Sequence, residues 1–171
     1  AEFTAEQVKD LVLKQVAKVA AYGLDAAELA RLKTVLRSEW ITTGPKVTEF
    51  EEAVAASVGA RYAVSFSSGT AALHGAVFAA GLGPGDEAIT SPLTFCATAN
   101  CLLYQGAVRV FADGLPDTLT LDPAEIRRRM TPRTKAILPV DYAGHPADQA
   151  DILALAEARG LVVIEHACQA L

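Results

Sequence analysis

The stretch YAVSFSSGTAALHGA, from Tyr62 to Ala76, decides how the rest of the chain is interpreted. Its first five residues, 62–66, are apolar and favour a β-strand. Four small, turn-prone residues follow, and the Ala-rich run 71–80 then predicts a tightly packed helix. The stretch therefore predicts a strand, a short turn and a helix that begins just after a Gly flanked by hydroxyl residues.

The start of this helix is a candidate anion-binding site. The first N–H groups of a helix lack intrahelical partners, and the helix dipole places roughly half a positive charge there, which suits a phosphate. Gly69 lets the backbone approach a ligand closely, and Ser68 and Thr70 add hydroxyl donors. An ordinary helix-capping turn is the alternative, because these residues by themselves fit both interpretations.

From residue 62 onward, short apolar runs alternate with helical patterns. The expected strands are 62–66, 87–91, 107–112, 135–140 and 161–165, and the expected helices are 71–80, 94–104, 123–130 and 149–159. Strands that are apolar throughout and separated by helices indicate a parallel sheet covered on both faces. The predicted fold class is therefore α/β, with a mostly parallel sheet flanked by helices.

The chain before this region is predicted to be helical. A capping-box pattern at Thr4 opens a helix that Gly23 ends, and a second box opens a helix at Asp25. The loop ITTGP, 41–45, separates these from a third helix over 47–58. We therefore expect an N-terminal helical segment, 1–58, and a second domain, 59–171.

Composition excludes several classes of protein. Hydrophobic residues make up 51% of the 171-residue chain, which is enough for a large core. A net charge of −5 and a pI near 5.2 argue against a nucleic-acid binder. No apolar run reaches the length of a bilayer span. The three cysteines lack metal-ligand spacing, so we expect reduced thiols in a cytoplasmic protein without a metal site.

Several stretches together resemble one family. They are SEWITTGPKVTEFEEAVA (38–55), SSGTAALHGA (67–76), GLGPGDEAITSPLTFCATAN (81–100), TPRTKAILPVDYAGHPAD (131–148) and VIEHACQAL (163–171). The chain from about Leu24 onward resembles the DegT/DnrJ/EryC1/StrS sugar aminotransferases, which are pyridoxal-phosphate enzymes of fold type I. The SPLTF and VDYAG segments are most similar to C4 transaminases of UDP-4-keto-6-deoxy amino sugars, as in pseudaminic acid synthesis.

The resemblance implies a role for individual residues. Ser68, Gly69 and Thr70 match the segment that holds the cofactor phosphate, in agreement with the helix-terminus argument. Phe95 matches the aromatic residue stacked on the pyridine ring, although a core Phe is the alternative. Gln169 matches the residue that hydrogen-bonds the ring hydroxyl. The remaining matches, in a loop near the substrate, are Thr42, Thr43 and Gly44.

His166 departs from the family pattern. The family has an acidic residue at this position, whose carboxylate pairs with the protonated pyridine nitrogen and lets the ring absorb carbanion charge. A neutral His can accept the same hydrogen bond, whereas a protonated His repels the pyridinium. A structural His at a strand end is the alternative. Glu165 is expected to point to the opposite face of the sheet, so it cannot replace the missing carboxylate.

The absence of a match to the family's Schiff-base lysine is a second departure. We expect both this lysine and the small C-terminal domain of the family to lie beyond Leu171. None of the lysines present matches it: Lys9, Lys14, Lys18, Lys33, Lys46 and Lys135. In the family's sheet, the last two strands lie between strand 62–66 and the others. We therefore expect strand 62–66 to be paired by rearrangement or by another chain, since unpaired buried backbone groups are costly.

The sequence leaves three functions open. The first is a pyridoxal-phosphate aminotransferase that acts on a nucleotide-linked keto sugar with glutamate as amino donor, works as a homodimer, and is inactive as this partial chain alone. The second is a non-catalytic remnant of the fold that binds a phosphate-bearing ligand or a partner protein. A family dehydratase, in which a histidine replaces the lysine, is a third alternative.

Overall fold

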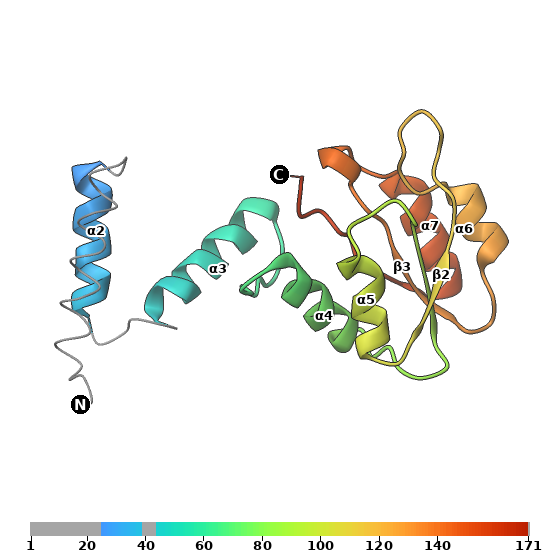
Figure 1. The fold of residues 1–171 in the computed structure, drawn as a ribbon, viewed down its shortest axis with the longest axis horizontal. Coiled ribbons are helices and arrows are strands. Elements are labelled where there is room, and N and C mark those ends of the chain that lie inside the picture. Colours follow the sequence, from blue (N-terminus) through green and yellow to red (C-terminus); the bar gives the residue numbers. More distant parts are fainter. Residues whose placement is uncertain (1–24, 39–43, 171) are drawn as a thin grey trace. The chain divides into compact units, whose positions relative to one another are not determined.

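The computed structural model describes residues 25–38 and 44–170, and the chain divides into two compact units, 1–65 and 66–171. In the first unit, helix α2 spans Ala26–Arg37 and helix α3 spans Pro45–Val58 (Figure 1). The helix expected to end at Gly23 lies outside the described residues, as do Thr42 and Thr43.

Capping interactions fix where these two helices begin. The Asp25 carboxylate accepts hydrogen bonds from the backbone N–H groups of Ala27 (2.7 Å) and Glu28 (2.8 Å), and Glu28 accepts one from the Asp25 N–H (3.0 Å). This arrangement is the predicted capping box. Helix α3 begins two residues earlier than predicted, because Pro45 occupies its first turn, where the missing N–H of proline costs nothing.

The second unit contains the predicted parallel sheet. Its strands are β1 (Glu87–Thr90), β2 (Val108–Phe111), β3 (Thr134–Leu138) and β4 (Val162–Val163). They pair in parallel in the order β2-β1-β3-β4. Helix α4 (Gly69–Ala79) precedes β1, and α5 (Ala97–Tyr104), α6 (Pro123–Arg129) and α7 (Gln149–Arg159) connect successive strands. The α/β class and the mostly parallel sheet are therefore confirmed.

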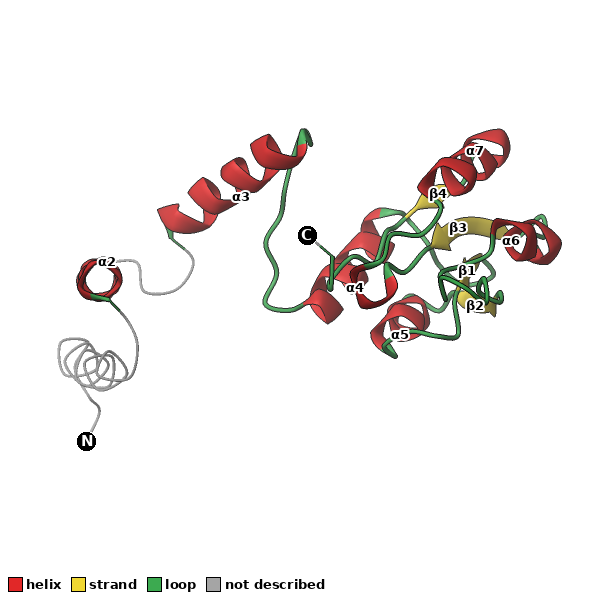
Figure 2. Cartoon of the chain, turned by 90° about the horizontal axis from the view of Figure 1, so that it is seen from above, coloured by secondary structure: helices red, strands yellow, loops and turns green. Residues whose placement is uncertain are grey.

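The helices of the second unit form a layer on each face of the sheet, with α4 and α5 on one side and α6 and α7 on the other (Figure 2). Side chains that alternate along the strands are buried against opposite layers. The first cluster includes Leu73, Val77, Ala88, Leu102, Ala136 and Leu138. The second includes Ile89, Leu121, Ile126, Ile137 and Ile152. Both faces are apolar because both are covered, as the sequence pattern predicts.

The strand predicted at residues 62–66 is not present, because this segment pairs with no strand among the described residues. Its apolar side chains remain largely exposed, with 72% of Tyr62, 70% of Val64 and 48% of Phe66 accessible. Within the first unit, the Ser65 N–H and hydroxyl donate instead to the Glu51 carboxylate, each at 2.7 Å. Residues 25–38 and 44–170 thus show no rearrangement that pairs this segment, and pairing with another chain stays a prediction.

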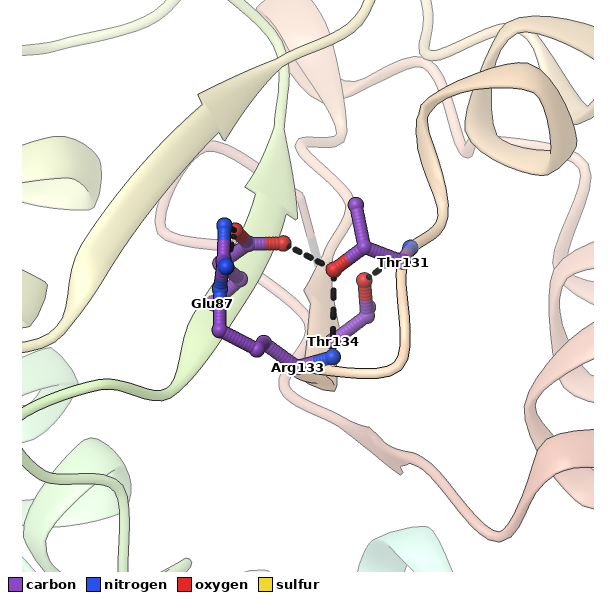
Figure 3. A network of polar contacts seen from close by, with 4 residues as sticks. All are labelled: Glu87, Thr131, Arg133 and Thr134. Atoms are coloured by element: carbon purple, nitrogen blue, oxygen red, sulfur yellow. Dashed lines mark hydrogen bonds and ion pairs between the residues drawn. The ribbon is translucent and has the colours of Figure 1, made fainter.

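A polar network ties β1 to the turn before β3 (Figure 3). The Glu87 carboxylate is 5% exposed and accepts hydrogen bonds from the Thr131 hydroxyl (2.5 Å) and from the Arg133 guanidinium (Nε at 2.9 Å). The Thr131 hydroxyl accepts the Arg133 N–H (3.1 Å), and the Thr131 N–H donates to the Thr134 hydroxyl (2.9 Å). These hydrogen bonds, led by that of Thr131, hold the pKa of Glu87 below its ordinary value despite burial.

No helix in residues 25–38 or 44–170 is both long and apolar enough to cross a bilayer.

Candidate functional site

A cavity of about 300 Å³ lies where several connections of the sheet converge. Its walls come from the first turn of α4, the segment before α5, the segment after β3 and the segment after β4. In parallel sheets, ligand sites form beyond the carboxyl ends of the strands, which is where the last three segments begin. The cavity includes five of the six residues predicted to hold a cofactor: Gly69, Thr70, Phe95, His166 and Gln169.

Ser68, the sixth, caps helix α4 and is not among the residues that line the cavity. Its hydroxyl accepts the Ala71 N–H (3.2 Å) and its carbonyl accepts the Ala72 N–H (3.0 Å). The N–H groups of Gly69 and Thr70 have no acceptor among the described residues. They therefore remain available at the positive end of an 11-residue helix.

Gly69 is required by close packing. A Cβ atom at this position would lie 2.5 Å from the Cys168 sulfur, closer than any ordinary contact. The glycine thus lets the segment after β4 lie directly against the start of α4. Both residues line the cavity, so this contact sets its shape at the helix terminus.

Phe95 presents an aromatic face to the cavity. Its side chain is 66% exposed, whereas a core Phe is buried, so the alternative role as a core residue is not supported. Its backbone is held in place, because the Phe95 carbonyl accepts the Thr98 N–H at 3.1 Å. An exposed ring at a cavity wall is suited to stacking on another aromatic ring.

His166 is fixed by its backbone and by one ring nitrogen. Its N–H donates to the Pro139 carbonyl (2.9 Å) and its carbonyl accepts the Asp141 N–H (3.1 Å), which extends the β3–β4 pairing. Its Nδ1 lies 2.7 Å from the hydroxyl of Thr98, a buried residue of α5. Burial lowers the pKa of His166, and the negative charge of Asp141 partly opposes that shift.

Two carboxyl groups lie near His166 without sharing its position. The buried Asp141 accepts the Ala147 N–H at 3.0 Å and lines the cavity. Glu165 does not line it, and instead accepts a hydrogen bond from Gln149 of α7 (2.5 Å). Since His166 faces α5 and Glu165 faces α7, the two point to opposite faces, as predicted. Desolvation of the carboxyl raises the pKa of Glu165, and the charge of Asp141 adds to this.

Of the residues expected near the substrate, only Gly44 is described, and it is the N-cap of α3 in the first unit. In the described part of the chain, no group of three His, Cys, Asp or Glu side chains is placed to hold a metal ion.

Sequence reasoning missed seven cavity residues, of which four carry a hydroxyl, carboxyl or thiol group: Thr94, Asp141, Tyr142 and Cys168. It also missed Thr98, which positions the His166 ring. Asp141 and Tyr142 directly follow the apolar run 135–140, so the rule that sites lie at the carboxyl ends of strands could have found them. No local signal marks Thr98, because its role depends on a residue 68 positions away.

Comparisons with known proteins agree on one family. The pattern of the DegT/DnrJ/EryC1/StrS aminotransferase family matches residues 23–171. The chain is 49% identical over 143 residues to the spore coat polysaccharide biosynthesis protein SpsC of Bacillus subtilis, spanning 84% of this chain and 37% of SpsC.

Solved structures give the same result. DesV of S. venezuelae, in complex with a ketimine intermediate, is 36% identical, with a TM-score of 0.81 over 92% of this chain and 42% of DesV. NtdA of Bacillus subtilis, with bound cofactor PMP, is 40% identical, with a TM-score of 0.74 over 76% of this chain and 30% of NtdA. The chain thus spans well under half the length of these relatives. It belongs to the DegT/DnrJ/EryC1/StrS aminotransferase family.

Proposed function

We propose that this chain forms part of a pyridoxal-phosphate-dependent aminotransferase that acts on a nucleotide-linked keto sugar, with glutamate as amino donor. The observation that carries the proposal is a single cavity in which a helix N-terminus, an exposed aromatic ring and a histidine nitrogen come together. These three features correspond to the phosphate, the ring and the ring nitrogen of one cofactor.

The residues present fit this group. The unpaired N–H groups of Gly69 and Thr70 and the Thr70 hydroxyl would hold the phosphate at the start of α4. Phe95 would stack on the ring, and Gln169 would donate to the ring hydroxyl. His166 stands where the family has a carboxylate, and it fits as a neutral acceptor.

When bound, pyridoxal phosphate supplies an electron sink for carbanion chemistry. The chain's own residues supply binding and orientation. The α4 terminus balances the charge of the phosphate, and Phe95 fixes the plane of the ring. Burial lowers the pKa of His166 and so favours its neutral imidazole, which can accept a hydrogen bond from a protonated ring nitrogen.

Further features of the proposal rest on family resemblance. The Ser38–Ala55 stretch, including Thr42, Thr43 and Gly44, resembles the family's substrate loop, which supports a sugar substrate near these residues. A homodimer is proposed because the family builds each site from two subunits. The three cysteines are free thiols in the structure, which is compatible with the reducing cytoplasm.

A binding-only function is the second candidate. The described lysines are Lys33, Lys46 and Lys135, and none of them lines the cavity. We therefore expect this chain by itself to hold the cofactor noncovalently and to show no transamination. The same cavity would then serve as a binding site for a phosphate-bearing aromatic ligand.

Titration of the chain with pyridoxamine phosphate by isothermal calorimetry tests the cofactor site. Phe95→Ala should weaken binding about 2- to 12-fold, the equivalent of a 0.5–1.5 kcal/mol stacking interaction. Phe78→Ala is the matched control, because Phe78 is 71% exposed on α4 and does not line the cavity. Equal losses in both variants, or no binding by the parent chain, would refute the cofactor site.

A second experiment separates the two functions. The chain is incubated with pyridoxal phosphate and then treated with borohydride, and the intact mass is measured. A covalent mass gain on one lysine, together with formation of an amino sugar from a UDP-linked keto sugar and glutamate, would establish the enzyme. Reversible binding without either product would establish the binding-only function for this chain.

A further inference from the structure

We propose that Thr98 holds His166 in the tautomer that carries its proton on Nδ1, leaving Nε2 as a neutral acceptor for a cationic heteroaromatic N–H group. Thr98 is a positioning residue in this arrangement, and nothing in the sequence marks it. The ligand part of the inference rests on the proposed function, whereas the tautomer is a property of the chain alone.

The Thr98 hydroxyl has a single proton to donate and three neighbouring polar atoms. This oxygen lies 3.1 Å from the Phe95 carbonyl, 2.7 Å from the Thr94 hydroxyl and 2.7 Å from Nδ1 of His166. The carbonyl can only accept, so the Thr98 proton must point to it if that contact is a hydrogen bond. Thr98 then accepts from both other partners, which requires a proton on Nδ1.

The opposite tautomer makes one hydrogen bond fewer around the Thr98 hydroxyl. If Thr98 donated to Nδ1, its 3.1 Å contact with the Phe95 carbonyl would carry no proton. The Phe95 carbonyl would still accept the Thr98 N–H (3.1 Å), so the opposite tautomer loses only the hydroxyl–carbonyl hydrogen bond. Only the arrangement with Nδ1–H makes all three contacts hydrogen bonds.

The second ring nitrogen of His166 is open. Among the described residues, no hydrogen bond involves Nε2, and no buried side-chain nitrogen or oxygen lacks a partner. Because His166 is only partly buried, Nε2 is therefore accessible, and the residue lines the cavity. A neutral imidazole with Nδ1–H has a lone pair on Nε2, which suits a protonated pyridine-type nitrogen.

Long-range ¹H–¹⁵N correlation spectra of the chain at pH 8, without any ligand, test the tautomer. The His166 signals are assigned by their loss in His166→Gln. Nδ1 should show the chemical shift of a protonated nitrogen and Nε2 that of an unprotonated one. The reverse pattern in the parent chain would overturn the inference.

Three variants separate positioning from structure. Thr98→Val removes the acceptor and should shift the His166 signals toward the tautomer with the proton on Nε2, whereas Thr98→Ser should restore the parent pattern. Thr94→Val is the matched control, because it also removes a hydroxyl but leaves the Thr98 acceptor in place. An unchanged His166 pattern in Thr98→Val would overturn the role of Thr98.

The ligand is tested with pyridoxamine phosphate and its analogue in which a C–H group replaces the ring nitrogen. A hydrogen bond to a charged donor predicts that the pyridine compound binds about tenfold tighter or more. Equal affinity of the two compounds would overturn the acceptor role while leaving the cofactor site intact. Failure of both to bind would overturn the proposed function and the ligand assignment, and the spectra would still decide the tautomer.

Discussion

Replacing Glu87 with Gln probes the network that joins β1 to the turn before β3. Each carboxylate oxygen has its own partner, since Oε2 accepts from Thr131 and Oε1 accepts from Arg133. Gln keeps one acceptor oxygen and places an N–H₂ group at the other position. One of the two donors therefore loses its acceptor, in a site where the side chain is 5% exposed.

The size of the loss depends mostly on Thr131. A hydrogen bond to a buried charged group contributes about 1.5–3 kcal/mol. The Arg133 side chain is 68% exposed, so its ion pair with Glu87 contributes only about 0–1 kcal/mol. We expect Glu87→Gln to lower the free energy of unfolding by about 1.5–3 kcal/mol at pH 7, and Arg133→Met to lower it by less than about 1 kcal/mol.

Urea unfolding followed by far-UV circular dichroism measures both changes. The pKa of Glu87 is lower in the folded chain than in the unfolded chain. The Glu87 carboxylate therefore contributes fully to stability above its unfolded pKa, near 4.3, and this contribution is lost as the pH falls through its folded pKa. The difference in the free energy of unfolding between the parent chain and Glu87→Gln should therefore shrink as the pH is lowered. An equal gap at pH 7 and at pH 3, or an Arg133→Met loss as large as that of Glu87→Gln, would refute this account.

Three further predictions concern α5 and α4 and use the same unfolding assay. Leu102→Ala should lower the free energy of unfolding by about 2–5 kcal/mol, because Leu102 is fully buried. Leu103 is 46% exposed, so Leu103→Ala should change the free energy of unfolding by no more than about 0.5 kcal/mol. Similar losses in the two variants would contradict the assignment of Leu102 to the core. Ser68→Ala should lower the free energy of unfolding by about 0.5–2 kcal/mol, and Ser68→Gly by only a few tenths of a kcal/mol, because Ser68 caps α4. An unchanged free energy of unfolding in Ser68→Ala would argue against the cap. Gly69→Ala should raise the free energy of unfolding by about 0.5–1 kcal/mol only in a chain that also carries Cys168→Ala. Cys168→Ala removes the sulfur that lies 2.5 Å from the position of the added Cβ. If the effects of the two substitutions were additive, the two side chains would not be in contact.

Much of the fold follows from short-range sequence patterns. The runs 87–91 and 135–140 each bury apolar residues against both helix layers, as expected of strands covered on both sides. Helix α7 matches its predicted range, 149–159, because Asp148 caps its start and Gly160 ends it in a left-handed conformation that suits glycine. Local chemistry determines these boundaries, so the sequence is sufficient to place them.

The segment 62–66 shows where such reasoning fails. Its composition favours a strand as strongly as the run 87–91 does, yet a strand also needs a neighbour with free backbone groups. No strand among the described residues pairs with it. β-propensity describes fit to a sheet surface, so it cannot supply the partner.

Some residues of the candidate site have a signal in the sequence and others do not. Gly69, Thr70 and Phe95 could be predicted, because a turn before a helix and an exposed position after a strand have sequence signals. Asp141 also has such a signal, because it follows the run 135–140 at the end of a strand, whereas Thr98 becomes notable only through a contact with a residue far along the chain. Long-range contacts of this kind leave no periodic pattern.

The presence of His166 raises the question of whether a nearby carboxylate could take over the role of the missing acidic residue. Asp141 lines the same cavity, but its Oδ1 already accepts the Ala147 N–H at 3.0 Å. Its charge also acts on Glu165, whose pKa is raised. Glu165 itself is turned toward Gln149 on the other face of the sheet. Glu165 is therefore turned away from the cavity, whereas Asp141 and His166 both line it. The proton position that Thr98 imposes decides whether His166 presents an acceptor to a cationic N–H group there.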